Sequence, residues 1–211
     1  MIRYLIWDVD GTIFDTYPAM ARAFGAALND LGAEAPLERI ESLARQRLSH
    51  CAAMLAREAD VSLEELREGF AQHYKSTPPQ AQAPFPDVVE VCEYARSIGG
   101  TNVIITHRGR ESALQLLATH EMGAYFVDIL TRGDGYPRKP DPAIYEAMIE
   151  RHGFEREETL AIGDRDIDVL AGQAAGVHTC LFGTASDQVA ADFTIADYAE
   201  LQRIIAGERN F

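Results

Sequence analysis

Six short apolar runs, rich in β-branched and aromatic residues, recur along this chain and limit its fold more than any other feature. Their hydrophobicity is nearly continuous, without regular alternation of apolar and polar residues, and this pattern is typical of strands buried on both faces of a parallel sheet. The last run, DFTI, is the weakest of the six signals. The runs cover residues 2–7, 101–106, 125–130, 159–163, 178–182 and 192–195.

Helical patterns separate the later runs. Residues 110–123 form one such segment, and its final glycine suits the position just after a helix. In residues 141–153, Asp141 can cap a helix, Pro142 suits its first position, and the final glycine again suits the position past its end. Helices and strands therefore alternate from residue 86 onward, which predicts a doubly wound α/β fold with a parallel sheet and right-handed crossovers.

The stretch from residue 17 to residue 76 breaks this alternation. It contains no convincing strand and is typical of four consecutive helices, and the stretch that follows it, STPPQAQAPFPD, has the Pro-rich composition of a linker. A chain of 211 residues is long enough for one core and one modest insertion. We therefore expect an α/β core formed by residues 1–15 and 86–211, with an all-helical insertion and its linker over residues 16–85.

The formal net charge of −14 limits the partners of this protein. Such a charge repels phosphate backbones and anionic membranes, so neither nucleic acid nor a membrane surface is expected as a partner. An anionic substrate would have to be held by local positive charge, from a metal ion or from a few Lys and Arg side chains.

The cysteine content and the first residues indicate the cellular compartment in which this protein is expected. Cys51, Cys92 and Cys180 are odd in number and lack the spacing of a metal site, so reduced thiols are the simplest interpretation. The apolar stretch at the start is too short, and too soon interrupted by acids, for a signal peptide, and no run approaches the length of a membrane span. We expect a cytoplasmic protein.

Two carboxylates, Asp8 and Asp10, follow the first apolar run. In open parallel sheets ligands bind at the carboxyl ends of the strands, and two acids this close repel each other unless a cation shares them. A hard divalent ion with oxygen ligands is the natural partner, and Gly11 lets the backbone approach a bound anion. The alternative is that Asp10 and Gly11 form only a turn and that Asp8 only caps it, but a buried strand that ends in two acids favours the functional interpretation.

Two further polar residues are expected at the same edge of the sheet. Thr106 ends the second run and offers a hydroxyl, followed by backbone N–H groups at the start of a helix, although Thr commonly caps helices without binding anything. Lys139 precedes Pro140 in a rigid turn, and its ammonium can neutralise both phosphate and aspartate charge. His107 and Arg108 are either substrate contacts or exposed loop residues, and the second alternative is favoured.

Acids also follow the fourth run, in the sequence GDRDID. Its Asp spacing resembles a calcium loop, but Val169 and Ala175 occupy the positions where that loop needs Gly and Glu. Asp164 and Asp168 instead add acid to the edge that carries Asp8, while Arg165 and Asp166 are expected at the surface. Asp168 has an alternative role as an acid at a helix N-terminus.

In their order along the chain, DVDGT, the Thr of IITHRG, the Lys of RKPDP and GDRDID resemble the four motifs of the haloacid dehalogenase superfamily of phosphotransferases. Each motif alone is weakly diagnostic, and the order and spacing of all four give the resemblance its specificity. It spans essentially the whole chain. The helical insertion resembles the type 1 cap of phosphoglycolate phosphatase-like and β-phosphoglucomutase-like members, which implies a Rossmann-like core and a cap that closes over the site.

The resemblance implies a role for each motif residue. Asp8 would be the nucleophile that forms an aspartyl-phosphate, and Asp10 would protonate the leaving group and later activate water. Thr106 and Lys139 would bind the transferring phosphoryl group. Mg²⁺ would be held by Asp8, by the backbone carbonyl of Asp10, by Asp164, and by Asp168 either directly or through water.

Three other functions are weighed against a phosphatase of a small phosphorylated metabolite. A phosphomutase would use the same core residues, so the motifs do not separate it from a phosphatase. A dehalogenase would lack the second acid, so Asp10 argues against that branch, and retention of all four motifs argues against a non-catalytic binding protein. Substrate specificity should lie in the insertion, where the candidates, each more often an ordinary surface or packing residue, are Tyr17, Arg45, Arg47 and His50.

Overall fold

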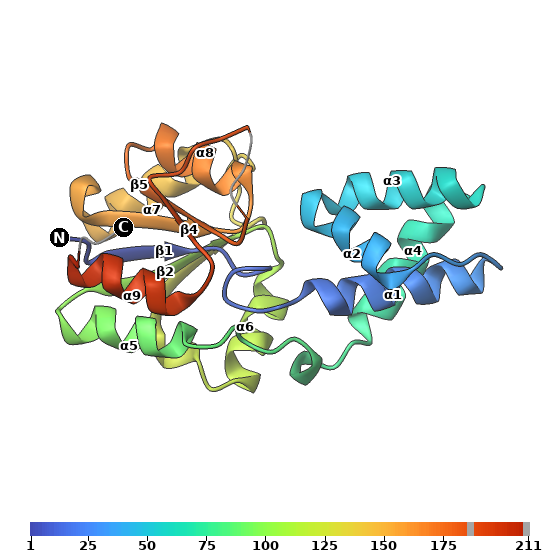
Figure 1. Ribbon diagram of the computed structural model, residues 1–211, viewed down its shortest axis with the longest axis horizontal. Coiled ribbons are helices and arrows are strands. Elements are labelled where there is room, and N and C mark those ends of the chain that lie inside the picture. Colours follow the sequence, from blue (N-terminus) through green and yellow to red (C-terminus); the bar gives the residue numbers. More distant parts are fainter. Residues whose placement is uncertain (185–187, 209–211) are drawn as a thin grey trace. The chain divides into compact units, whose positions relative to one another are not determined.

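The computed structural model describes residues 1–184 and 188–208 and divides the chain into two compact units (Figure 1). One unit comprises Met1–Phe14 and the chain from Pro84 onward, and the other comprises Asp15–Ala83. The division lies within two residues of the expected boundaries, and the roles expected for the two parts stay predictions.

The first unit is built on a six-stranded sheet in which every pairing is parallel, in the order β3-β2-β1-β4-β5-β6. The strands are β1 Tyr4–Trp7, β2 Thr101–Thr106, β3 Phe126–Thr131, β4 Thr159–Gly163, β5 His178–Phe182 and β6 Phe193–Ile195. The chain starts in the middle of the sheet and proceeds first to one side and then to the other. This order confirms the expected doubly wound parallel fold.

Helices cover both faces of this sheet (Figure 1). Alternate strand residues point to opposite faces, so that Leu5 and Trp7 join one apolar core and Ile6 joins the other. The first core packs against α5 Val88–Ser97, α6 Arg110–Thr119 and α9 Tyr198–Ala206. The second core packs against α7 Ala143–His152 and α8 Asp166–Ala174. Burial on both faces explains why the strand sequences are continuously apolar.

Two helix ends differ from the expected ones. The helix expected over residues 110–123 ends at Thr119, because Glu121 adopts a left-handed φ of 56° and the chain then turns Met122 into the core. The helix expected from Pro142 starts at Ala143 instead, with Pro142 in the capping position. Asp141 does accept a hydrogen bond from the backbone N–H of Ala143, at 3.0 Å.

The second unit consists of helices with an apolar core of their own. They are α1 Tyr17–Asp30, α2 Leu37–Gln46, α3 Leu48–Ala59 and α4 Leu63–Lys75. The core includes stacked rings of Phe24 and Phe70, whose centroids are 3.9 Å apart, and Ser62 caps α4 by accepting a hydrogen bond from Glu65. The four expected helices are therefore present.

The specificity candidates lie in different environments within this second unit. Tyr17 is buried, and the guanidinium of Arg45 lies 4.6 Å from the centre of its ring, while Arg47 and His50 are exposed. Arg45 also forms an ion pair of 2.7 Å with Glu41 along α2. These contacts are typical of packing and of a helix surface, and none of them tests a role in specificity.

The chain leaves the first unit and returns to it along paired backbone. Phe85 N–H donates to the carbonyl of Ile13 at 3.0 Å, and Asp15 N–H donates to the carbonyl of Ala83 at 2.9 Å. Phe14 and Pro84 form an antiparallel bridge between these two bonds.

The three cysteines are buried and unbridged. Within residues 1–184 and 188–208, no helix is both long enough and apolar enough to cross a membrane.

Candidate active site

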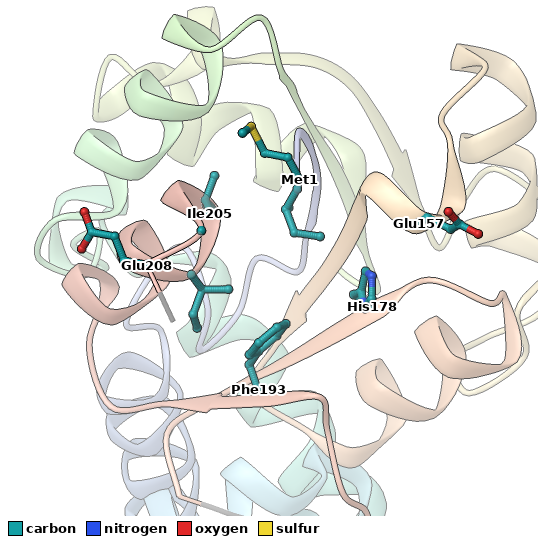
Figure 2. Close-up of a pocket in the computed structure, with 9 residues that line it drawn as sticks. Met1, Glu157, His178, Phe193, Ile205 and Glu208 are labelled. Carbon is teal, nitrogen blue, oxygen red and sulfur yellow. The ribbon is translucent and has the colours of Figure 1, made fainter. Parts of the chain in front are cut away.

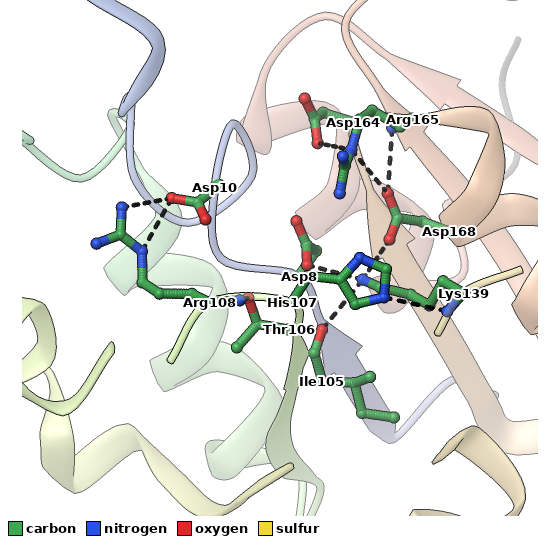
Figure 3. Close-up of polar contacts among 10 residues, drawn as sticks. All are labelled: Asp8, Asp10, Ile105, Thr106, His107, Arg108, Lys139, Asp164, Arg165 and Asp168. Carbon is green, nitrogen blue, oxygen red and sulfur yellow. Dashed lines mark hydrogen bonds and ion pairs between the residues drawn. The ribbon is translucent and has the colours of Figure 1, made fainter. Parts of the chain in front are cut away.

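The polar residues of the first unit meet where the central strands end (Figure 3). Because β1 lies between β2 and β4, the residues after Trp7, at Thr106 and after Gly163 reach one edge of the sheet. In the parallel register, Trp7 pairs with Ile104 of β2 on one side and with Ile162 of β4 on the other. The expected convergence of Asp8, Thr106 and Asp164 follows from this strand order.

Asp8 is almost completely buried, with 1% of its surface exposed. Its backbone N–H donates to the carbonyl of Ile162 at 2.9 Å, which extends the sheet pairing beyond the end of β1. Its Oδ1 accepts a hydrogen bond of 2.7 Å from Nζ of Lys139, whereas its buried Oδ2 accepts no hydrogen bond from the described residues. Burial raises the pKa of Asp8 to about 6, although the positive charge of Lys139 opposes the shift.

Lys139 is the buried cation of this edge. Its Nζ donates to Oδ1 of Asp8, to Oδ1 of Asp168 and to the carbonyl of Ile105. Burial alone would lower the pKa of Lys139, but the negative charges of Asp168 and Asp8 outweigh it and raise the pKa above its ordinary value. The ammonium therefore stays charged and is shared by two carboxylates.

Asp168 is 1% exposed and is held at the start of α8. Burial would raise the pKa of Asp168, but the charges of Lys139 and Arg165 hold it below its ordinary value. Its Oδ2 accepts a hydrogen bond of 3.3 Å from the backbone N–H of Arg165, as in a capping box. The alternative role as an acid at a helix N-terminus is thus also present in the geometry.

Asp8, Asp164 and Asp168 form an acidic cluster, which we call the triacid cluster. One carboxylate oxygen from each of the three lies within 4.8 Å of the others. Hard divalent ions prefer such oxygen ligands, and a buried carboxylate oxygen without a hydrogen bond, as found at Asp8 Oδ2, fits a position that a cation would occupy. The triacid cluster could therefore hold a metal ion, while the part expected of the Asp10 carbonyl stays a prediction.

The Asp10 carboxylate is turned toward Arg108 and away from the Asp8 side chain (Figure 3). Nε and Nη2 of Arg108 donate to Oδ1 of Asp10 at 3.0 and 2.6 Å. Arg108 is 8% exposed, so the favoured expectation of an exposed loop residue is wrong. The Asp10 carboxylate compensates the charge of the guanidinium, and this ion pair allows Arg108 to be buried at the sheet edge.

His107 is also less exposed than expected. Its Nε2 accepts a hydrogen bond of 3.1 Å from the backbone N–H of Lys139, so the ring supports the segment that carries the buried lysine. Burial, together with the nearby charge of Lys139, lowers the pKa of His107 to about 4, which keeps the ring neutral and able to accept this bond. The sequence signal that could have revealed both residues is their position directly after Thr106.

Thr106 is 1% exposed, and its hydroxyl oxygen accepts a hydrogen bond of 3.1 Å from the backbone N–H of Arg108. The helix that follows starts at Arg110, as expected, and residues 107–109 form a loop between Thr106 and this helix. Because the hydroxyl oxygen is an acceptor in this bond, its proton can be donated to an anion.

Arg165 and Asp166 are partly buried rather than at the surface as expected. Nε of Arg165 lies 3.9 Å from Oδ1 of Asp164 and 4.0 Å from Oδ2 of Asp168. Arg165 therefore adds positive charge beside the triacid cluster.

A pocket of about 440 Å³ lies at the opposite edge of the sheet, where the strands begin (Figure 2). His178 and Phe193, the first residues of β5 and β6, line it together with Met1 and Ile205. This pocket is separate from the triacid cluster, which lies at the carboxyl ends of the strands.

Comparisons with known proteins agree with this geometry. A model of the haloacid dehalogenase-like hydrolase family matches residues 5–182. A phosphoglycolate phosphatase from Aquifex aeolicus (strain VF5) is 27% identical over 210 residues, which cover 97% of each chain.

Two solved structures share the fold. A protein assigned as a β-phosphoglucomutase from Thermotoga maritima has a TM-score of 0.81 at 19% identity, over 99% of this chain and 100% of that one. A hydrolase of the same family from Deinococcus radiodurans R1, with bound phosphate and sodium, has a TM-score of 0.82 at 19% identity, over 98% of this chain and 96% of that one.

Proposed function

We propose a reaction for this chain from the premise that it belongs to the haloacid dehalogenase-like hydrolase family, whose model covers residues 5–182. The protein is a phosphatase that acts on a small phosphorylated substrate, a function supported by the relative named phosphoglycolate phosphatase. The observation that carries this function is the buried Asp8 carboxylate, which contacts the Lys139 ammonium and belongs to the triacid cluster.

In the first step, a carboxylate oxygen of Asp8 attacks phosphorus, and the bond between phosphorus and the ester oxygen breaks. With a pKa of about 6, Asp8 is mostly ionised at neutral pH and can act as a nucleophile. Asp10 donates a proton to the leaving oxygen, and an aspartyl-phosphate forms on Asp8. Thr106 and Lys139 bind the transferring phosphoryl group and offset its charge.

In the second step, water attacks the phosphorus of the aspartyl-phosphate. Asp10, now a carboxylate, takes a proton from that water, and the bond between phosphorus and Asp8 breaks to release inorganic phosphate. Asp8 returns as a carboxylate and Asp10 as an acid, so the enzyme is ready for another cycle.

The donor set fits Mg²⁺, which in this proposal is held by the carboxylates of Asp8, Asp164 and Asp168 and by the backbone carbonyl of Asp10. When bound, the ion supplies positive charge that offsets the negative charge of the phosphoryl group. Bound phosphate and sodium in the Deinococcus radiodurans R1 relative support an anion and a cation site on this fold.

A phosphomutase is the second candidate, and the Thermotoga maritima protein assigned as a β-phosphoglucomutase favours it. The two candidates differ in the acceptor of the second step, which is water for a phosphatase and a sugar phosphate for a phosphomutase. Incubation with a hexose 1-phosphate separates them, because only a phosphatase converts it to inorganic phosphate instead of hexose 6-phosphate.

The helical unit Asp15–Ala83 serves in this proposal as the cap that selects the substrate. This role rests on the resemblance to capped members of the family. A panel of phosphorylated sugars, acids and nucleotides identifies the substrate class.

Hydrolysis of p-nitrophenyl phosphate tests the proposed function. We expect phosphate release that requires Mg²⁺ and that Asp8→Asn abolishes, since the amide keeps the shape of the side chain but is not a nucleophile. Asp60→Asn is the matched control, because Asp60 is exposed in a left-handed turn that asparagine also tolerates. Equal activity of the Asp8→Asn variant and the wild type would refute the proposal.

A further inference from the structure

The ion pair between Arg108 and Asp10 joins two loops that are 98 residues apart in the sequence. The Arg108 side chain is 5% exposed and the Asp10 side chain 21%. Two guanidinium N–H groups, from Nε and Nη2, donate to the same oxygen, Oδ1 of Asp10. A buried arginine held this closely fixes the rotamer of the carboxyl group that it contacts.

Other contacts hold the guanidinium itself in place. Nη1 of Arg108 donates to the hydroxyl of Ser112, in the first turn of α6, at 2.6 Å. The backbone N–H of Arg108 donates to the hydroxyl oxygen of Thr106. Arg108 is thus fixed at both its backbone and its side-chain end, and its placement is tied to a residue expected to bind phosphate.

The chemistry of the guanidinium limits where Asp10 can carry a proton. Guanidinium nitrogens are donors only, so an oxygen that accepts from two of them does not also present a proton toward them. In a carboxylic acid the oxygen that bears the proton is the weaker acceptor, so the two bonds from Arg108 to Oδ1 favour a proton on Oδ2. We propose that Arg108 is a positioning residue for Asp10, which anchors Oδ1 so that Oδ2 delivers the proton to the leaving group.

This inference rests on the proposed phosphatase function and concerns its first step. An Asp8 oxygen forms a bond to phosphorus, and the electron pair of the breaking bond goes to the ester oxygen. That oxygen takes the proton from Oδ2 of Asp10, so the alcohol leaves neutral and Asp10 remains as a carboxylate paired with Arg108. Atoms and charges balance without a further reactant.

The test compares two substrates that need this proton to different degrees. p-Nitrophenolate leaves without a proton at neutral pH, whereas the alkoxide of benzyl phosphate does not. The ratio kcat/KM reports the steps up to formation of the aspartyl-phosphate, so it isolates the step in which Asp10 acts as an acid. General acid catalysis commonly contributes 10²- to 10⁴-fold, and we expect Arg108→Gln to lower kcat/KM about tenfold more for benzyl phosphate than for p-nitrophenyl phosphate.

Three further variants make this comparison specific. Arg108→Lys keeps the charge but cannot make both contacts, and we expect it to restore part of the lost activity toward benzyl phosphate. Ser112→Ala keeps Arg108 and removes one of its supports, so it should shift the ratio of the two substrates in the same direction by less. Arg110→Gln is the matched control, because this neighbouring arginine pairs with Asp134 instead, and it should leave the ratio unchanged.

An equal loss for both substrates in Arg108→Gln would overturn the proposal, because it would indicate a role in phosphate binding or in folding. An unchanged or higher activity toward benzyl phosphate would also overturn it, since Arg108 would then hold Asp10 away from the reaction. A shift in the ratio of Ser112→Ala would support the proposal even if Arg108→Gln fails to fold, and an unshifted ratio would oppose it. Failure of the proposed function is separate, because the wild type would then release phosphate from neither ester, and both proposals would fall.

Discussion

A Cβ atom added to Gly163 would lie 2.3 Å from the Cβ atom of Asp168. The end of β4 and the first turn of α8 thus approach so closely that only glycine fits, and this approach brings Asp168 to the buried ammonium of Lys139. Such a distance is too short for two carbon atoms that are not bonded to each other, so a side chain at this position has to displace Asp168.

We therefore expect Gly163→Ala to reduce phosphatase activity strongly and to lower the free energy of unfolding by about 1–3 kcal/mol, as in overpacked cores. Phosphate release from p-nitrophenyl phosphate and urea denaturation measure the two effects. Gly123→Ala is the control, because nothing lies within 4 Å of the atom it adds, and it should change neither. Wild-type activity in Gly163→Ala would show that Asp168 is not required where it lies.

Loss of Lys139 should destabilise the protein in a way that depends on divalent cations. Lys139→Met leaves Asp8 and Asp168 as buried acids without their shared cation, and removal of one member of a buried ion pair costs about 3–5 kcal/mol. Urea denaturation of the variant in EDTA should show this loss, and Mg²⁺ should recover part of it through the triacid cluster. An effect that Mg²⁺ does not change would argue against a cation site there.

The histidine that supports Lys139 makes stability depend on pH. The pKa of His107 is about 4 in the folded protein and 6.5 ordinarily, so between these values the unfolded chain binds more protons. Its contribution to stability is therefore complete above pH 6.5 and is lost as the pH falls toward 4. As the pH falls from 6.5 to 4, we expect the Tm of the wild type to decrease more than the Tm of His107→Gln. A difference between the two Tm values that stays constant over this range would contradict the low pKa of His107.

The thiols should be unreactive in the folded protein. Burial raises the pKa of Cys51 to about 12 and also raises the pKa of Cys92 and of Cys180. Because the thiolate is the reactive form, Ellman's reagent at pH 8 should label the native protein very slowly and the urea-denatured protein at all three cysteines. Rapid labelling before denaturation would mean that the segments that bury these thiols open readily.

The sheet and the proximity of the triacid cluster residues could be predicted from the sequence, for one physical reason. Continuously apolar runs locate parallel strands, and the carboxyl ends of such strands meet, so acids placed directly after the runs must converge. Asp8 and Asp164 could be brought together in this way without knowledge of any contact between their side chains.

The same reasoning failed for His107 and Arg108. Their partners, Lys139 and Asp10, are 32 and 98 residues away, and loop conformation rather than periodicity decides such pairings. The end of α6 was also mispredicted. The glycine at residue 123 suggested a helix end there, but the helix ends at Thr119 and the chain turns so that Met122 is buried in the core.

The paired backbone around Phe14 and Pro84 has a wider consequence for how this architecture can diversify. Two hydrogen bonds hold the outgoing and the returning chain side by side. The helical unit is therefore attached to the sheet unit in the same way as a short loop between two paired strands. The entropic cost of closing a loop grows only slowly with its length, so an insertion of another size could be attached through the same two hydrogen bonds. If the helical unit selects the substrate, as proposed above, its helices could be exchanged while the strand ends that carry the triacid cluster stay unchanged.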